Sequence, residues 1–407
     1  MFFINKLLYN PFGKNIFFWI FSSCIAIIEF INTIGFISIS FSPYFIPLLI
    51  SIPVIISFFN THTKFSFLYL IFFIYLVLNV YITDPPVYFF SKLRLGLFII
   101  LLLGVSPIIE NHIIRYFRFN LYQIFFYFCI PVSVISFFCY FLGINFVHTA
   151  YEFNDLLNGK FGGLFKHSMI LGPLSACSTI ILVWMALNKN KSAWILAFLT
   201  FGAVLFSASR AALISVIGAL ISFGLTTSNK IFGSIKTIFI ISLLTFASYP
   251  LWETILEPIQ SKSERDYNGA TFDSRQDKVE ARVQEIKEEP ILGQGFSAID
   301  PTLDNFGDFE NGRVEPGSSW LAVFSMTGII GLLFFVLICI KAIKDILRAR
   351  SVYKSLFIAL LVFFLIHLIV EGYVYAAGSP LCFLFWLTIG ICTDLSYLTN
   401  SRNNKIL

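Results

Sequence analysis

One arginine stands inside a run of residues that is otherwise apolar enough for a membrane. It is Arg210, in the stretch FSASRAALI, residues 206–214. Charged side chains at membrane depth are costly, so they often mark a functional site. An arginine at the membrane surface can bind an anionic substrate, or it can extend its side chain to lipid phosphates with no further role. Position alone leaves both interpretations open.

A second arginine, Arg275, opens the one helix expected outside the membrane. The segment DSRQDKVEARVQEIKEEP, residues 273–290, predicts a helix because Val279, Val283 and Ile286 recur with helical spacing and a proline ends the pattern. This apolar stripe is typical of a helix that lies on a membrane surface or packs against a helix bundle. A cation in the first helical turn opposes the helix dipole, which suggests that Arg275 serves something other than helix stability.

Further polar residues stand at the edges of apolar runs and are candidates for substrate contact. They are Glu315, Ser318, Ser319 and Trp320 in EPGSSW, His167 at the start of a run, and Glu371 at the end of another. Each also has a simpler explanation: helix capping for the serines, an interfacial anchor for the tryptophan, and a surface charge for the acids. No His or Cys cluster has the spacing of a zinc site, so we expect neither a metal nor another cofactor.

The composition is that of a membrane protein. Of the 407 residues, 57% are hydrophobic, 13% are charged and 50 are phenylalanine, which is more apolar surface than a soluble fold can bury. There is no basic patch with interleaved aromatics, which argues against nucleic-acid binding. The seven cysteines all lie in apolar runs, as packing residues do. Lys6 and Lys14 ahead of the first apolar run predict a cytoplasmic flank and a first span, with no cleavable signal peptide.

Twelve apolar runs are long enough to cross a bilayer. They cover residues 16–38, 43–59, 65–83, 93–109, 121–143, 168–188, 192–208, 211–227, 235–252, 318–340, 354–374 and 379–396. The fold predicted is therefore an all-α polytopic membrane protein. Its parts are helices 1–9 in residues 1–252, a large polar loop domain in residues 253–317, and helices 10–12 with a tail in residues 318–407.

Lysines and arginines in the short loops predict the orientation. The even-numbered connections and the tail hold Lys64, Arg115, Arg118, Lys189, Lys191, Lys230, Lys236, Lys341, Lys344, Arg348, Arg350, Lys354, Arg402 and Lys405. The short odd-numbered loops hold only Lys92, Arg94, Lys160, Lys166 and Arg210. Both termini are therefore predicted to be cytoplasmic, with Arg210 and residues 253–317 on the external side.

Four segments, taken in this order and on this predicted side, resemble the superfamily of O-antigen ligases and O-antigen polymerases. They are FGGLFKHSMILG, SASRAAL, SRQDKVEARVQEIKEEPILGQGF and EPGSSWLAVFSMTGIIG. The resemblance is clearest over residues 160–335, and VEGYVYAAGSPLCFLFWLTIG near the end also fits it. It implies a GT-C-like, metal-independent, inverting glycosyltransferase of the bacterial inner membrane, which moves a glycan from undecaprenyl diphosphate to a hydroxyl on the external side.

The resemblance also implies site residues. Arg210 matches the family's arginine after the seventh span, and Arg275 matches its arginine ahead of a P-x-x-G-x-G segment. Many members carry a histidine where the chain re-enters the membrane before the tenth span, whereas this sequence has Glu315 near that place. Arg210, Arg275 and Glu315 are thus the expected catalytic residues, and His167, Ser318, Ser319, Trp320 and Glu371 the expected substrate contacts.

Three functions stay open at this point. The first is a polymerase of O-antigen or another surface polysaccharide, which we favour because the usual histidine is missing. The second is a ligase that transfers the finished glycan to lipid A core or to protein. The third is a transporter of lipid-linked oligosaccharides, which would be expected to place its charges along a central cavity. The expected partners are the undecaprenyl-diphosphate-linked oligosaccharide, an acceptor glycan or lipid, and membrane lipids. For a polymerase, a chain-length regulator is a further candidate partner.

Overall fold

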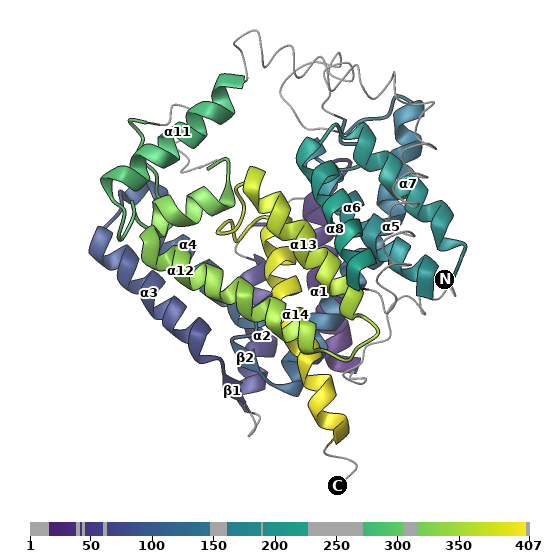
Figure 1. Ribbon diagram of the computed structural model, residues 1–407, viewed down its shortest axis with the longest axis horizontal. Helices are drawn as coiled ribbons and strands as arrows, with labels where there is room; N and C mark the ends of the chain where they lie inside the picture. The colour runs from purple at the N-terminus through teal and green to yellow at the C-terminus, as the bar shows by residue number, and fades with distance from the viewer. Residues whose placement is uncertain are drawn as a thin grey trace. The chain divides into compact units, whose positions relative to one another are not determined.

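The structure is a computed structural model that describes residues 16–37, 41–42, 45–59, 63–146, 161–188, 190–226, 272–303 and 316–403. Within these ranges the chain is mainly helical (Figure 1). The helices are α1 (Ile16–Thr33), α2 (Phe45–Phe58), α3 (Phe67–Thr83), η1 (Val87–Phe89), α4 (Ser91–Val105), α5 (His112–Phe141), α6 (Ser168–Asn188), α7 (Ala193–Phe206), α8 (Arg210–Thr226), α11 (Phe272–Glu288), α12 (Ser319–Arg348), α13 (Lys354–Val370) and α14 (Pro380–Asn403). Two short strands, β1 (Lys64–Phe65) and β2 (Ile109–Glu110), pair antiparallel with Lys64 opposite Glu110.

The helices support a polytopic membrane protein. Among the described residues, six stretches are long and apolar enough to cross a membrane: Ile16–Thr33, Val87–Val105, His112–Phe141, Ser168–Asn188, Ser319–Arg348 and Pro380–Tyr397. The apolar helices α2, α3, α7, α8 and α13 are shorter. A helix occurs at each predicted span that these ranges include, while the predicted span 235–252 lies outside them. The total of twelve spans and the bounds of the 253–317 domain therefore stay predictions.

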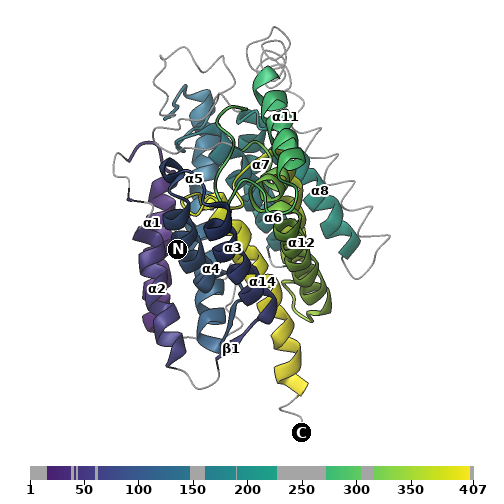
Figure 2. The same cartoon turned by 90° about the vertical axis from the view of Figure 1, so that its left-hand side faces the viewer.

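The chain divides into two compact units. Unit 1 comprises residues 1–41, 119–265 and 351–367, and unit 2 comprises residues 42–118, 266–350 and 368–407. In unit 1, α6 packs on α7 and α8, and the hydroxyls of Thr179 and Thr200 meet at 2.9 Å across the α6–α7 contact. In unit 2, α12 packs on α3, α11 and α14. In both views α11 and the β1–β2 pair lie at opposite ends of unit 2 (Figures 1 and 2).

The α12 helix is broken at Gly328, and the break receives the segment that follows α11. Gly328 has φ 61° and ψ −173°, which interrupts the helical hydrogen-bond ladder. Residues 290–295 supply the missing partners: Gln294 N donates to Ser325 O at 2.8 Å, Gly295 N to Met326 O at 3.0 Å, and Ile329 N donates to Pro290 O at 2.9 Å. Because backbone polar groups inside an apolar region must be paired, this segment and the break stabilise each other.

Gly328→Ala tests that arrangement. A methyl group at this position would collide with the Ile291 carbonyl and would force an L-residue into the left-handed region. We expect a loss of at least about 2 kcal/mol of stability, seen as a clear fall in the thermal unfolding midpoint of the purified protein. Gly96→Ala in α4 is the control, since a methyl group there meets nothing within 4 Å. Equal midpoints for the two variants would contradict the role of the break.

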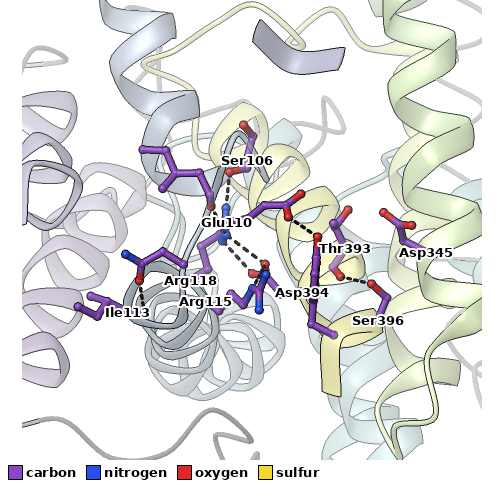
Figure 3. A network of polar contacts seen from close by, with 12 residues as sticks. Ser106, Glu110, Ile113, Arg115, Arg118, Asp345, Thr393, Asp394 and Ser396 are labelled. Carbon is purple, nitrogen blue, oxygen red and sulfur yellow. Dashed lines mark hydrogen bonds and ion pairs between the residues drawn. The ribbon is translucent and has the colours of Figure 1, made fainter. Parts of the chain in front are cut away.

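At the end of unit 2 away from α11, a buried ionic network joins the α4–α5 connection to α14 (Figure 3). Arg118 donates to both carboxylate oxygens of Asp394, at 2.8 and 3.0 Å, and to the carbonyls of Ser106 and Ile109. The guanidinium of Arg115 lies 3.6 Å from the centre of the Tyr397 ring. Both arginines count as loop charges in the orientation prediction, but they belong to α5, and Arg118 is fully buried.

Candidate functional site

Arg210 is the first residue of α8 and is exposed. The turn before it is tightly built: Ala208 has φ 49°, and the Ser209 hydroxyl accepts from Ala212 N at 3.3 Å, capping the helix. The turn packs on α6 at Gly172, where a Cβ would lie 2.8 Å from the Cβ of Ser209. A left-handed alanine is uncommon and costs free energy, so the surrounding packing holds this turn in one conformation and thereby fixes the start of α8.

His167 lies at the same end of unit 1 as Arg210. It directly precedes α6, and its Nδ1 accepts a hydrogen bond from Met169 N at 3.1 Å, so the imidazole caps the helix. It stands five residues before Gly172, the residue that contacts the turn ahead of Arg210. The helix-capping role therefore exists in the structure, and a substrate contact by the half-buried ring is a proposal in addition to it.

Arg275 lies in the first turn of α11, where the structure describes the backbone. The predicted valine stripe is not the buried face of this helix: Val279 is 41% and Val283 37% exposed, whereas Arg282 and Glu285 are fully buried. Of the two placements predicted for this stripe, packing against the helix bundle is wrong, and contact with a membrane surface stays a prediction. The physical reason is that Arg282 and Glu285 form an ion pair of 2.9 Å, so their charges offset each other where α11 packs on α12.

The exposed face of α11 borders an open hollow of about 580 Å³. Its lining residues are Asp277, Val279, Glu280, Ala281, Val283, Gln284, Lys287 and Leu303. Four of these residues are polar and four are apolar, a mixture that suits a partly apolar, hydroxyl-rich ligand. The hollow begins two residues after Arg275 in sequence.

The start of α12 and the loop after α13 form one hydrogen-bonded turn. Ser319 is fully buried; its hydroxyl donates to Glu371 O at 2.6 Å and accepts from Tyr373 N at 3.0 Å and Val374 N at 3.3 Å. Ser318 caps α12, accepting from Leu321 N at 3.5 Å. These contacts show the structural roles of both serines and bring Ser319 next to the backbone of Glu371, whereas a substrate contact by any of these residues stays a prediction.

Trp320 and Glu315 complete the predicted residues of unit 2. The Trp320 ring packs edge-on against Phe335, with 5.0 Å between the ring centres. Glu315 lies outside the described residues, directly before Pro316. Pro316 contacts the loop after α13 closely, because a Cβ at Gly372 would lie 2.5 Å from its Cγ. Residues 316–319, which directly follow Glu315, are thus held against the backbone of Glu371.

The described residues fall into two groups. Arg210 and His167 belong to unit 1, and Arg275, Ser318, Ser319, Trp320 and Glu371 belong to unit 2. Within the part of the chain that the structure describes, no group of three His, Cys, Asp or Glu side chains could hold a metal ion. The chemistry open to these residues is anion binding by arginine and proton transfer by a carboxyl group.

Glu285 predicts a pH dependence of stability. Burial raises its pKa to about 7, against the opposing effects of Arg282 and of the Asp300 N–H, which lies 2.7 Å from Oε1. A carboxyl group with a raised folded-state pKa binds more protons in the folded than in the unfolded state between about pH 4.5 and 7. Its contribution to stability is therefore complete below pH 4.5 and is lost as the pH rises to 7.

We expect the unfolding midpoint of the wild type to fall between pH 5 and pH 8 by the equivalent of about 2 kcal/mol more than that of Glu285→Gln. Thermal unfolding of both proteins across this range measures the difference. Glu280→Gln on the exposed side of α11 is the control and should follow the wild type. Parallel pH profiles for wild type and Glu285→Gln would contradict the prediction.

A comparison with protein families identifies a resemblance for one part of the chain. Residues 195–336 match the family model described as O-antigen ligase. This part of the chain, about a third of its length, is similar to O-antigen ligases. The match begins in α7 and ends in α12, so it includes Arg210 and Arg275, and it confirms the resemblance to the O-antigen ligase and polymerase superfamily. None of the curated proteins compared with the chain matches it.

The region that matches the O-antigen ligase family makes contacts that the sequence did not predict. The ion pair of Arg282 and Glu285 fixes the face of α11, and Asn79, outside the matched range, bonds to the segment after α11. A signal for Asn79 exists in the sequence, because an amide inside an apolar span needs a polar partner. No comparable signal marks Arg282, which sits among other charges in a polar helix.

Proposed function

We propose that the chain is a glycosyltransferase that moves an undecaprenyl-diphosphate-linked glycan onto an acceptor hydroxyl, as the polymerase of O-antigen or another surface polysaccharide. The observation that carries the proposal is the O-antigen ligase match over residues 195–336, which includes both Arg210 and Arg275 in a chain of apolar helices. The protein would lie in the bacterial inner membrane with both termini cytoplasmic and its site on the external side.

In the proposed reaction the acceptor hydroxyl oxygen attacks the anomeric carbon and the bond from that carbon to the diphosphate oxygen breaks. The anomeric configuration inverts because attack and departure occur on opposite faces. Undecaprenyl diphosphate leaves with the bonding electron pair. The guanidinium groups of Arg210 and Arg275 bind the phosphate oxygens and stabilise the charge that grows on them, and the reaction proceeds without a metal ion. Glu315 accepts the proton of the acceptor hydroxyl.

The remaining residues serve this reaction by position. Ser318 and Ser319 hold the re-entry turn after Glu315 through their bonds to Leu321, Glu371 and Tyr373. Trp320, Glu371 and His167 contact the sugars at the membrane surface. The hollow along α11 receives part of the glycan, since its mixed polar and apolar lining suits sugar rings.

The polymerase is preferred to the ligase because the histidine expected at re-entry is replaced by Glu315. A ligase would use the same lipid-linked donor and break the same bond to the diphosphate. Its acceptor would be lipid A core or protein. The two functions therefore make different glycan products from the same lipid-linked donor, and those products separate them.

Deletion of the gene, followed by analysis of the surface glycans on a gel, tests the proposal. Single repeat units without longer chains are the result expected for a polymerase. Long chains that stay on the lipid carrier, with no attached glycan, would instead assign the ligase. An unchanged glycan profile would overturn the transferase altogether and make transport the function to examine.

A further inference from the structure

The segment 290–297 joins α11 to three membrane helices of unit 2. Its backbone fills the break in α12, as described above. Two side chains hold it from other helices: Asn79 of α3, and Arg94 of α4, which donates to the Ser297 hydroxyl at 3.0 Å. The Tyr75 hydroxyl of α3 also donates to the Thr327 carbonyl beside the break. The segment thus connects the polar helix α11 to the apolar helices.

Asn79 has the most specific part in this arrangement. It is fully buried in α3; its Nδ2 donates to Leu292 O at 2.7 Å, and its Oδ1 accepts from Phe296 N at 2.9 Å. One side-chain amide therefore satisfies a carbonyl and an N–H on the two sides of the glycine turn. No other natural side chain of that length offers a donor and an acceptor in this geometry, since aspartate lacks the donor and leucine lacks both.

The position of the segment 290–297 affects the position of Arg275, because the two lie at opposite ends of α11. A small change in the tilt of the helix at the segment therefore moves Arg275 by a larger distance. Arg275 lies thirteen residues before Glu288, the last residue of the helix, which is about 20 Å along the helix axis. A tilt of about 5° at the segment would therefore move the backbone of Arg275 by about 1.7 Å. A displacement of about 1 Å in a catalytic group can lower a rate about 100-fold. Arg282 and Glu285, which are buried where α11 packs on α12, form a second attachment that limits rotation of the helix.

We propose that Asn79 is a positioning residue of the transferase, which fixes the segment 290–297 and through it the place of Arg275. The inference rests on the proposed function for its catalytic part. Its structural part, that Asn79 determines the position of α11, stands on the hydrogen bonds alone. The two parts need separate measurements.

The first measurement reports the position of α11 without any substrate. Nitroxide labels on Val283→Cys in α11 and Ile74→Cys in α3, both on exposed side chains, define one distance within unit 2. The full chain carries Cys24→Ser in this experiment, because Cys24 is exposed. Pulsed electron paramagnetic resonance in nanodiscs should give a narrow distance distribution, and Asn79→Ala should broaden or shift it. An unchanged distribution overturns the proposal.

The second measurement tests whether Asn79 acts through Arg275. The substrate is lipid-linked oligosaccharide extracted from the deletion strain, and glycan products are quantified per folded protein. We expect Asn79→Ala to lower kcat at least about 10-fold in the wild-type background and less than about 3-fold in the Arg275→Lys background. An equal fold-change in both backgrounds overturns the positioning role, because loss of folded protein or a general distortion multiplies with the Arg275 effect.

Asn120→Ala is the matched control, a buried asparagine of α5 in unit 1 that bonds neither Leu292 nor Phe296. It should leave the spin-label distance unchanged and give the same fold-change in both backgrounds. If the wild-type protein transfers no glycan, the proposed function fails, and broadening in Asn79→Ala still supports the structural part. The failure of either part can therefore be recognised separately.

Discussion

Arg210→Ala and Arg275→Ala are each expected to reduce glycan assembly at least about 100-fold when either variant replaces the wild type at matched expression. A diphosphate leaving group carries spread negative charge, and a planar guanidinium contacts two of its oxygens at once. Because water is scarce near the lipid boundary, the lost stabilisation of the transition state corresponds to about 3 kcal/mol or more. Gel analysis of the surface glycans in the deletion strain measures the effect.

Lysine replacements test whether the planar guanidinium is needed in addition to its positive charge. Arg210→Lys and Arg275→Lys keep the charge but lose the two-pronged contact, so each should restore only a minor part of the activity. Lys92→Ala is the control: Lys92 is on the same predicted external side, and its side chain is 62% exposed in a surface ion pair with Asp84. Normal glycan chains in either alanine variant would refute the diphosphate-binding role of that arginine.

Arg118→Met and Asp394→Leu should each destabilise the protein by about 3–5 kcal/mol. Each change leaves one charge buried: the two side chains are 0% and 1% exposed, and Arg118 bonds both oxygens of Asp394 (Figure 3). Arg115 lies 3.6 Å from Asp394 and compensates only part of the loss for that carboxylate. Thermal unfolding midpoints and the yield of folded protein measure the effect.

The double variant Arg118→Met/Asp394→Leu distinguishes the loss of pairing from a general loss of packing. It should recover much of the stability that either single variant loses, since both of the fully buried charges are then absent and only Arg115 loses its contact with Asp394. Asp84→Asn, which breaks the exposed pair with Lys92, should cost less than about 1 kcal/mol. Additive losses in the double variant would contradict a network in which Arg118 and Asp394 depend on each other.

Much of the fold follows from local sequence. Long apolar runs must pair their backbone groups internally, so α1, α6 and α14 are readable as helices without any tertiary information. The resemblance to O-antigen ligases could also be recognised from the sequence. It depends on short local segments and their order along the chain, among them the turn before Arg210 and the glycine turn after α11. The family match over residues 195–336 confirms it.

Local sequence did not predict which face of α11 is buried. Helical periodicity places Val279 and Val283 on one stripe and predicts that this stripe contacts either a membrane surface or the helix bundle. Tertiary packing buries Arg282 and Glu285 against the bundle instead. Periodicity ranks faces by hydrophobicity alone, whereas the free energy of burial also depends on whether charges find partners. The pairing of Arg282 with Glu285, and of Glu285 with the Asp300 N–H, exists only in three dimensions.

The sequence by itself determined the class of this protein, the positions of the apolar helices that the structure describes and the resemblance of residues 195–336 to O-antigen ligases, because these depend on composition and on neighbouring residues. Tertiary structure alone decided that Asn79 holds a segment more than 200 residues away, that Gly328 opens α12 to receive it, and that Arg118 meets Asp394. Such contacts join distant parts of the chain, so their donors and acceptors can be matched only once the helices have packed.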